Sequence, residues 1–271
     1  MIERLRSHYG FTRTPFGRDL APGMLFKHTA HAEAAARLTW CITEKAIGMV
    51  TGEVGVGKTV ALRAALGTLD PARYSIIYIA DPEIGMRGIL TQLIVALGGN
   101  PKPHLATLIP QAADILAGEH AERGRTPVLI LDEAHLLNHA QLDALRMMTN
   151  HDLDSRQPFA LLLLGQPTLR RMIKLGVLAA LDQRISVRYP MGGMTAEETS
   201  GYIHHHLQLA GRSDPLFSDD AITLIHESAR GKPRTVNNLA IQALLASFAA
   251  GKAIVDESAA RSAVTEVISP E

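Results

Sequence analysis

The sequence has little of several residue types that define whole classes of protein. Only one cysteine, Cys41, is present among 271 residues, so neither an internal disulfide nor a cysteine-ligated metal cluster can form. This scarcity is typical of a reducing compartment. Lys plus Arg and Asp plus Glu number 27 each, so the balanced charge indicates neither a nucleic-acid nor an acidic partner, although it leaves room for a locally basic surface.

Long hydrophobic runs are also missing. The run FALLLL at 159–164 is far shorter than the roughly 20 apolar residues of a transmembrane helix. The first residues, MIERLRSHYGFTRTPF, lack the apolar stretch of a secretory signal. We find no internal repeat and no low-complexity segment. We therefore expect a cytoplasmic protein that makes no membrane contact and is complete, or nearly so, in itself.

A regular alternation of short apolar runs and helical patterns fills most of the sequence. Helical spacing is found at about 31–46, 58–66 and 139–149, among other places. Runs of strand length occupy residues 47–51, 75–80, 128–132, 159–165 and 185–190. Five near-continuous apolar strands separated by helices predict an α/β fold with a parallel sheet covered on both faces.

Strand patterns stop after residue 193. Thr195 and Glu198 form a capping box that begins a helix, Ser218 is a second N-cap, and Val236, Leu239 and Ala243 mark a third helix. We therefore predict three parts. Residues 1–30 form an irregular arm whose aromatic residues pack on the α/β domain, residues 31–193 form that domain, and residues 194–271 form a small all-helical lid domain.

The segment GEVGVGKT at 52–59 matches the phosphate-loop pattern G-x-x-x-x-G-K-[ST] at every fixed position. Its glycines allow a tight turn whose backbone N–H groups point into one concavity, at the start of a helix. A chance glycine-rich turn is the alternative, but this segment follows a predicted strand and begins a predicted helix. We expect the nucleotide to be bound by Gly52, Glu53, Val54, Gly55, Val56, Gly57, Lys58, Thr59 and Val60.

The segment VLILDEAH at 128–135 ends a buried strand with two carboxylates. Together with the phosphate loop it predicts ATP hydrolysis with Mg²⁺: Thr59 and Asp132 hold the metal, Lys58 contacts the β- and γ-phosphates, and Glu133 polarises the attacking water. A solvated acidic turn is the alternative for an isolated Asp-Glu pair. His135 is expected to be an ordinary loop residue.

Five motifs in order, GEVGVGKT, VLILDEAH, LLLLGQPTLR, LDQRI and GKPRTVNNL, resemble those of the ExeA-like AAA+ ATPases. The opening YGFTRTPFGRDLAPGMLFKHTAH resembles the arm that precedes the phosphate loop in that family. The resemblance spans nearly the whole chain. It implies an AAA+ P-loop domain with a five-stranded parallel sheet, followed by a small helical lid.

The same resemblance implies three further site residues. Gln166 corresponds to the polar sensor near the γ-phosphate, Arg184 to the arginine finger that reaches a neighbouring subunit's nucleotide, and Arg234 to the lid arginine. A guanidinium suits these places because its planar fork matches phosphate oxygens. Surface ion pairs are the structural alternative for both arginines. Arg188 is a rival finger, although strand alternation explains it more simply.

Stand-alone relatives of the TniB, TnsC and IstB type assist DNA transposases. This resemblance implies a slow, oligomer-stimulated ATPase that forms a ring or helical oligomer with ATP on double-stranded DNA and recruits a transposase. An ATPase module of a secretion or envelope complex is the alternative, although those relatives continue past the lid, where this chain ends. A P-loop small-molecule kinase is a further alternative, against which the Asp132-Glu133 pair and Arg184 weigh.

Three consecutive histidines, His204, His205 and His206, fall on a predicted helix of the lid. Consecutive side chains fan apart around a helix, so they do not converge on one metal. We expect them to lie on a solvated helix face.

Overall fold

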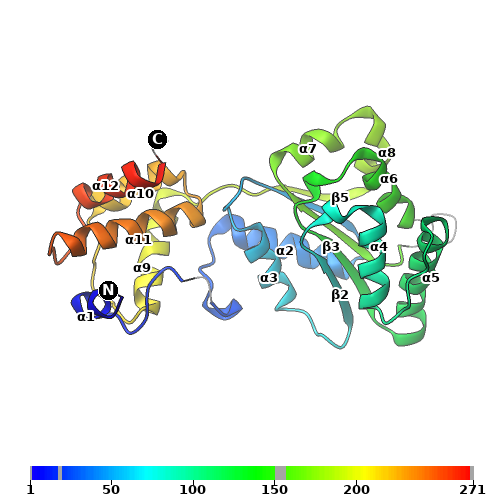
Figure 1. Cartoon of the computed structure of the whole chain (residues 1–271), viewed down its shortest axis with the longest axis horizontal. Helices are drawn as coiled ribbons and strands as arrows, with labels where there is room; N and C mark the ends of the chain where they lie inside the picture. Colours follow the sequence, from blue (N-terminus) through cyan, green and yellow to red (C-terminus); the bar gives the residue numbers. More distant parts are fainter. Residues whose placement is uncertain (1, 18–19, 150–156, 269–271) are drawn as a thin grey trace. The chain divides into compact units, whose positions relative to one another are not determined.

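The computed structural model describes residues 2–17, 20–149 and 157–268 (Figure 1). The chain divides into two compact units. One unit comprises residues 31–54 and 58–191 and contains a β-sheet. The other comprises residues 1–30, 55–57 and 192–271 and is helical.

The sheet has five strands in the order β2-β3-β4-β1-β5, and every neighbouring pair is parallel. The strands are β1 (Ile47–Thr51), β2 (Tyr74–Ile79), β3 (Thr126–Leu131), β4 (Ala160–Gly165) and β5 (Ile185–Pro190). The predicted five-stranded parallel sheet is therefore confirmed. Observed strand bounds differ from the predicted ones by at most two residues.

The two faces of the sheet bury different sets of side chains. Because side chains alternate along a strand, the odd-numbered residues point to one face. Strand register aligns these residues in rows across the sheet, such as Ile77, Leu129, Leu161 and Ile47. They belong to one large hydrophobic cluster.

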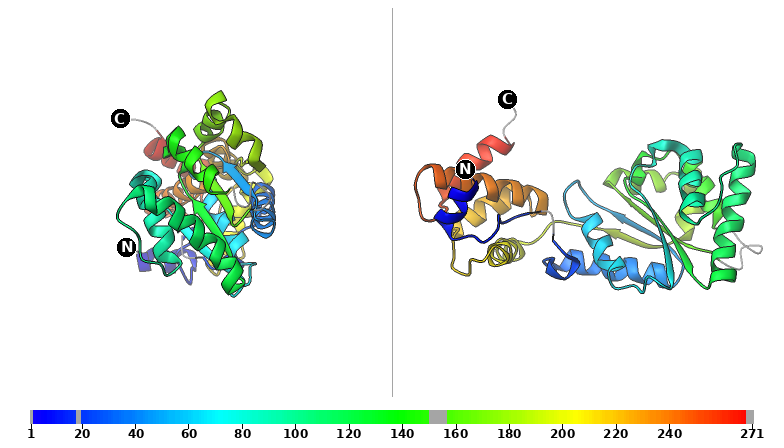
Figure 2. Two further views of the ribbon diagram at one scale, coloured as in Figure 1. Left: turned by 90° about the vertical axis from the view of Figure 1, so that its right-hand side faces the viewer. Right: turned by 60° about the horizontal axis from the view of Figure 1, so that its bottom comes forward.

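Helices cover both faces (Figures 1 and 2). The connection from β1 to β2 runs in the opposite direction across the sheet from those that lead from β2 to β5. Because such crossovers are right-handed, α3 (Lys58–Leu66) lies on one face. The helices that lie on the other face are α4 (Gly85–Ala96), α5 (Leu105–Arg123), α6 (His139–Met148), α7 (Pro167–Ile173) and α8 (Ala179–Arg184).

Helix α2 (Thr29–Thr43) lies against β1 on the face of α3. A Cβ placed on Gly48 would lie 2.7 Å from the Cys41 sulfur, so only glycine allows this close approach. Burial raises the pKa of the Cys41 thiol to about 12. Cys41 is therefore a small core residue that stays protonated at neutral pH.

The helical unit contains α9 (Ala196–Leu209), α10 (Asp219–Ala229), α11 (Pro233–Ala249) and α12 (Glu257–Ile268). The predicted caps are present: the Thr195 hydroxyl accepts a bond from the Glu198 N–H, and Ser218 caps α10. Helix α12 was not predicted. Its buried side chains Ala259, Ala260 and Ala263 are small and give a weak periodic signal in the sequence.

The arm differs from its prediction in two ways. It begins with a helix, α1 (Ile2–Tyr9), and carries a short 3₁₀ turn at Pro22–Met24. Its apolar residues Leu5, Tyr9, Phe11 and Phe16 are part of the hydrophobic core of the helical unit. The prediction that the arm packs on the α/β domain was therefore wrong.

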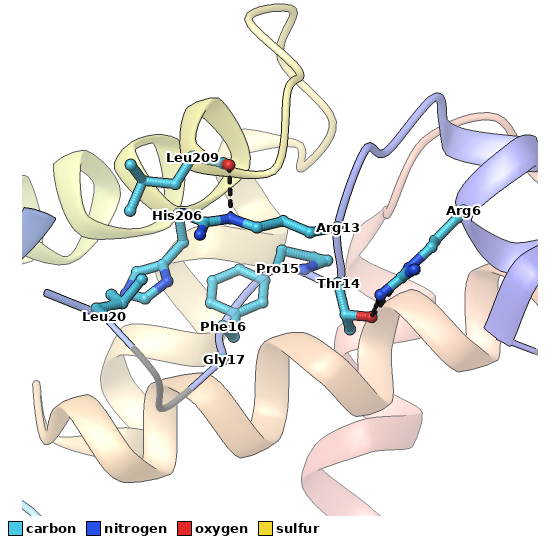
Figure 3. Close-up of a pocket in the computed structure, with 9 residues that line it drawn as sticks. All are labelled: Arg6, Arg13, Thr14, Pro15, Phe16, Gly17, Leu20, His206 and Leu209. Atoms are coloured by element: carbon cyan, nitrogen blue, oxygen red, sulfur yellow. Dashed lines mark hydrogen bonds between the residues drawn. The ribbon is translucent and has the colours of Figure 1, made fainter.

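The consecutive histidines explain part of the arm's attachment. His206 is 4% exposed and stacks on Phe16, with ring centroids 5.2 Å apart (Figure 3). His205 Nε2 lies 2.8 Å from the Met24 carbonyl oxygen. Arg13 donates from Nε to the Leu209 carbonyl at 2.8 Å, as Figure 3 shows. A solvated helix face was the wrong expectation here, because two of the histidines hold the arm against α9.

A pocket of about 270 Å³ lies between the arm and α9. Its lining includes Arg6 and Arg13 as well as Phe16 and His206 (Figure 3). Both arginines use their guanidinium groups to fix the arm, since Arg6 donates to the Thr14 hydroxyl oxygen and Arg13 to α9.

Candidate nucleotide site

The glycine-rich loop follows β1 at the carboxyl edge of the sheet. Both neighbouring strands fix its starting point: the Gly52 N–H donates to the Gly165 carbonyl at 3.1 Å, and the Met191 N–H donates to the Thr51 carbonyl at 2.7 Å. Gly55 and Gly57 have φ values of +85° and +101°, which other residues rarely adopt. These glycines therefore permit the turn that the phosphate-loop pattern predicts.

Lys58 is the first residue of α3 and is 6% exposed. Its ammonium donates to the carbonyl oxygens of Gly52 at 2.9 Å and Glu53 at 3.2 Å. The ammonium is thus held beside the loop, next to the N-terminus of the helix. A positive charge and a helix N-terminus at one place favour a bound anion such as phosphate.

Asp132 follows β3 and is 5% exposed, and hydrogen-bond donors surround its carboxylate. Thr59 Oγ1 and the Tyr78 hydroxyl each donate to Oδ2 at 2.9 Å, while the Glu133 N–H donates to Oδ1 at 2.9 Å. The two residues expected to hold Mg²⁺, Thr59 and Asp132, are therefore in direct contact.

Tyr78 was not predicted as part of the site. It lies on β2, opposite Ile130 in the register, so its side chain shares a face with Asp132 two residues further along. Burial raises the pKa of the Tyr78 hydroxyl, and so do the hydrogen bond to Asp132 and the charges of Asp132 and Glu133. Tyr78 therefore remains a donor at neutral pH.

Glu133 has left-handed backbone angles, φ 48° and ψ 34°. Such angles are uncommon outside glycine and tend to occur at functional sites. Its side chain is 41% exposed, and Oε2 lies 3.3 Å from Nδ1 of His135, a ring that is only 12% exposed. His135, which we expected to be an ordinary loop residue, therefore contacts the predicted general base.

Gln166 is the N-cap residue of α7, directly after β4. Its backbone N–H donates to His135 Nδ1 at 3.5 Å. The predicted sensor and the predicted base are thus connected through one histidine ring. No hydrogen bond from the Gln166 side chain to the helix backbone holds it at the cap.

Arg184 ends α8, and its Nη1 donates to the Thr149 hydroxyl oxygen at 2.8 Å. Burial lowers its pKa, and the neighbouring charge of Arg146 adds to the effect. Arg188, the rival finger, donates to both the carboxylate and the backbone carbonyl of Asp182. Arg188 thus has a negatively charged partner, Asp182, within its own chain.

Arg234 begins α11, in the helical unit. Its backbone N–H donates to the Gly55 carbonyl at 3.2 Å, and Gly55 belongs to the same unit. A Cβ on Gly55 would lie 2.9 Å from the Arg234 Cβ, so this contact requires glycine. The structure thus places the backbone of Arg234 against a glycine of the phosphate loop.

The strand order, the glycine-rich loop and the Asp132-Glu133 pair together define an AAA+ P-loop fold. Residues 42–173 match the family model described as AAA domain. The General secretion pathway protein A of Aeromonas hydrophila is 32% identical to this chain over 246 residues, which is 90% of this chain and 45% of the relative. The chain therefore spans about half the length of this relative.

Solved structures share the fold at low sequence identity. Cdc6p from Pyrobaculum aerophilum has a TM-score of 0.71 and 16% identity, with 93% of this chain and 70% of that chain covered. The Aeropyrum pernix ORC1 protein in complex with DNA has a TM-score of 0.63 and 15% identity, with 93% and 68% covered. Separately, none of the described helices is long and apolar enough to cross a bilayer.

Proposed function

We propose that the chain binds ATP with Mg²⁺ at the phosphate loop and hydrolyses it, as a nucleotide-dependent switch in an assembly. One observation carries this proposal. The Thr59 hydroxyl and the Asp132 carboxylate meet at 2.9 Å beside the buried ammonium of Lys58, and Glu133 is the next residue.

The donor set suits Mg²⁺. Thr59 and Asp132 offer oxygen atoms, which this cation prefers, and Mg²⁺ in nucleotide sites is held by one or two protein oxygens together with phosphates and water. The described residues hold no cluster of three His, Cys, Asp or Glu side chains that could form an all-protein cage. The metal would neutralise charge that develops on the phosphate oxygens.

The residues of the site then have separate roles. Lys58 and the loop N–H groups hold the β- and γ-phosphates, and Glu133 takes a proton from the attacking water. Gln166 contacts the γ-phosphate side of the site. Arg234 senses the nucleotide that is bound in its own subunit. Arg184 completes a neighbouring subunit's site, so turnover is slow until subunits assemble into a ring or filament.

Two substitutions test this proposal. Lys58→Ala removes the buried ammonium, so tight ATP binding should be lost. Glu133→Gln keeps the size of the side chain but removes the base, so binding should persist while turnover falls about 10²–10⁴-fold. Equilibrium binding of a fluorescent ATP analogue and phosphate release measure the two effects. Hydrolysis by Glu133→Gln at the unaltered rate would show that the assigned base is wrong.

For the assembly's role, we propose a regulator of DNA transposition that assembles with ATP on double-stranded DNA and recruits or activates a transposase. The motif order resembles the transposition helpers, and a solved structure of the same fold is an ORC1 protein in complex with DNA. A second candidate is an ATPase module of a secretion complex, which the likeness to General secretion pathway protein A favours. A DNA-binding measurement, argued below, distinguishes the two.

A further inference from the structure

His135 occupies a position that neither the phosphate-loop motif nor the Asp-Glu pair explains. It lies in the 3₁₀ turn Ala134–Leu136 that links β3 to α6. Its ring is mostly buried at 12% exposure, whereas the carboxylate it touches, that of Glu133, is 41% exposed. A fixed ring therefore contacts a side chain that is otherwise free to move in solvent.

The turn itself is held tightly against the end of β4. A Cβ on Gly165 would lie 3.2 Å from the backbone nitrogen of His135 and 3.0 Å from a methyl group of Leu169. The glycine thus lets the turn approach the strand closely, directly before Gln166. Any shift at the end of β4 is transmitted to the His135 backbone, because protein interiors have little free volume.

One ring nitrogen faces two partners. Nδ1 lies 3.3 Å from Glu133 Oε2 and 3.5 Å from the backbone nitrogen of Gln166. A neutral imidazole nitrogen is either a donor or an acceptor, never both. With its proton on Nδ1, His135 donates to Glu133, and with its proton on Nε2, it accepts from the Gln166 N–H. The two hydrogen bonds therefore exclude each other.

We propose that His135 is a positioning residue that orients the Glu133 carboxylate and couples its orientation to the end of β4 at Gln166. This inference rests on the proposed role of Glu133 as the base. A hydrogen bond from a buried donor reduces the conformational freedom of an exposed carboxylate, so more of the molecules have the base in one orientation. The coupling follows because Nδ1 can donate to Glu133 only when it no longer accepts the hydrogen bond from the Gln166 N–H.

The kinetic test compares His135→Ala with two other variants. We expect His135→Ala to lower kcat about tenfold and to change the dissociation constant of a non-hydrolysable ATP analogue less than twofold. His135→Asn, whose side-chain amide can donate from nearly the same place, should recover part of the loss. His139→Ala is the matched control, since His139 is an exposed histidine four residues further along.

A double-mutant cycle separates positioning from general destabilisation. If His135 acts through Glu133, then adding His135→Ala to Glu133→Gln should change the residual rate less than twofold. An equal tenfold loss in both backgrounds would overturn the proposal, and so would weakened binding of the analogue. A lower melting temperature in His135→Ala but not in His135→Asn would identify a packing role instead.

A second measurement does not depend on turnover. Nitrogen-15 NMR of the imidazole rings reports which nitrogen of each histidine carries the proton. Glu133→Gln should shift the His135 tautomer equilibrium toward Nε2–H and leave His139 unchanged. An unchanged His135 signal would overturn the contact. A shifted signal in Glu133→Gln, together with no ATP hydrolysis by the unaltered chain, would retain the contact while rejecting the proposed ATPase function.

Discussion

At the Asp132 carboxylate, two hydroxyl groups share one oxygen. Thr59 and Tyr78 both donate to Oδ2 at 2.9 Å, and Asp132 is 5% exposed. In our proposal the Thr59 oxygen is a ligand of Mg²⁺, and a ligand oxygen turns its lone pair toward the metal. Tyr78 would then be the hydroxyl that continues to fix the carboxylate, as partners of ligating groups commonly do.

Tyr78→Phe tests this division of roles. The variant keeps the ring and removes the hydroxyl, so we expect the Mg²⁺ concentration for half-maximal turnover to rise about tenfold, at the low end of such losses. Stability should fall by about 1–3 kcal/mol, because the lost bond has a charged acceptor. Magnesium titration and urea unfolding measure the effects. Tyr74→Phe, at the other end of the same strand, should change neither, and equal effects in both variants would contradict the assignment.

At the scale of elements, we expect the packing of the arm against α9 to lose stability in acid. Burial lowers the pKa of His206 from 6.5 to about 4, and the neighbouring His205 and Arg13 add to this effect. The folded state therefore binds fewer protons here than the unfolded state does. The stability that depends on neutral His206 is present above pH 6.5 and is lost as pH falls toward 4.

We expect this loss to be on the order of 3 kcal/mol for a shift of this size. His206→Phe removes the titrating group and keeps a ring against Phe16. The variant should therefore lose less stability than the unaltered chain between pH 7.5 and pH 4.5, as measured by urea unfolding of both. His104→Phe replaces an exposed histidine and should follow the unaltered chain. Parallel pH curves for all three proteins would show that His206 is not buried in neutral form.

Most of the sheet was predictable from the sequence because β1, β3 and β4 are buried on both faces and read as continuous apolar runs. Residues 128–132, for example, correspond to β3 at Thr126–Leu131. The surface against which the arm packs was not predictable. Leu5 and Tyr9 have helical spacing, but the surface they cover includes α11, far away in the sequence.

The site likewise contains residues that the sequence predicts and residues that it does not. A local motif specifies Lys58 and Thr59, and the end of a buried strand indicates Asp132 and Glu133. Tyr78 and His135 reach these groups only through strand register and through the packing of a turn on β4. A sequence-only signal existed for Tyr78, because it has the same parity as Asp132 on what proved to be the adjacent strand.

At the scale of the whole molecule, the proposed finger Arg184 predicts that activity depends on assembly. If Arg184 completes a neighbour's site, turnover per subunit should rise with protein concentration. Arg184→Ala subunits should inhibit mixtures, since such a finger contributes about 10³–10⁵ in rate. Arg188→Ala is the matched control, because Arg188 is bound to Asp182 in its own chain. Linear kinetics from a protein that remains monomeric with an ATP analogue would contradict this role.

The last prediction concerns DNA. In our proposal the ATP-bound assembly binds double-stranded DNA with little sequence preference, and ADP weakens the complex. The chain has no net charge, so its composition gives no separate support for DNA binding, and we expect the contacts of each subunit to be weak. Assembly would multiply these weak contacts into useful affinity, because each bound subunit raises the effective concentration of DNA for the next.

Fluorescence anisotropy at low salt, with Glu133→Gln and ATP, is the deciding experiment. Binding should fall steeply with salt, since each neutralised phosphate contributes about 0.9 to the slope of log K against log salt. Arg87, exposed on α4, is our first candidate for a contact, and Arg87→Ala should reduce that slope. Arg261→Ala is the control, because Arg261 pairs with Glu257 on α12. No binding at micromolar protein would reject the DNA role and favour the secretion candidate, whose partner is another protein.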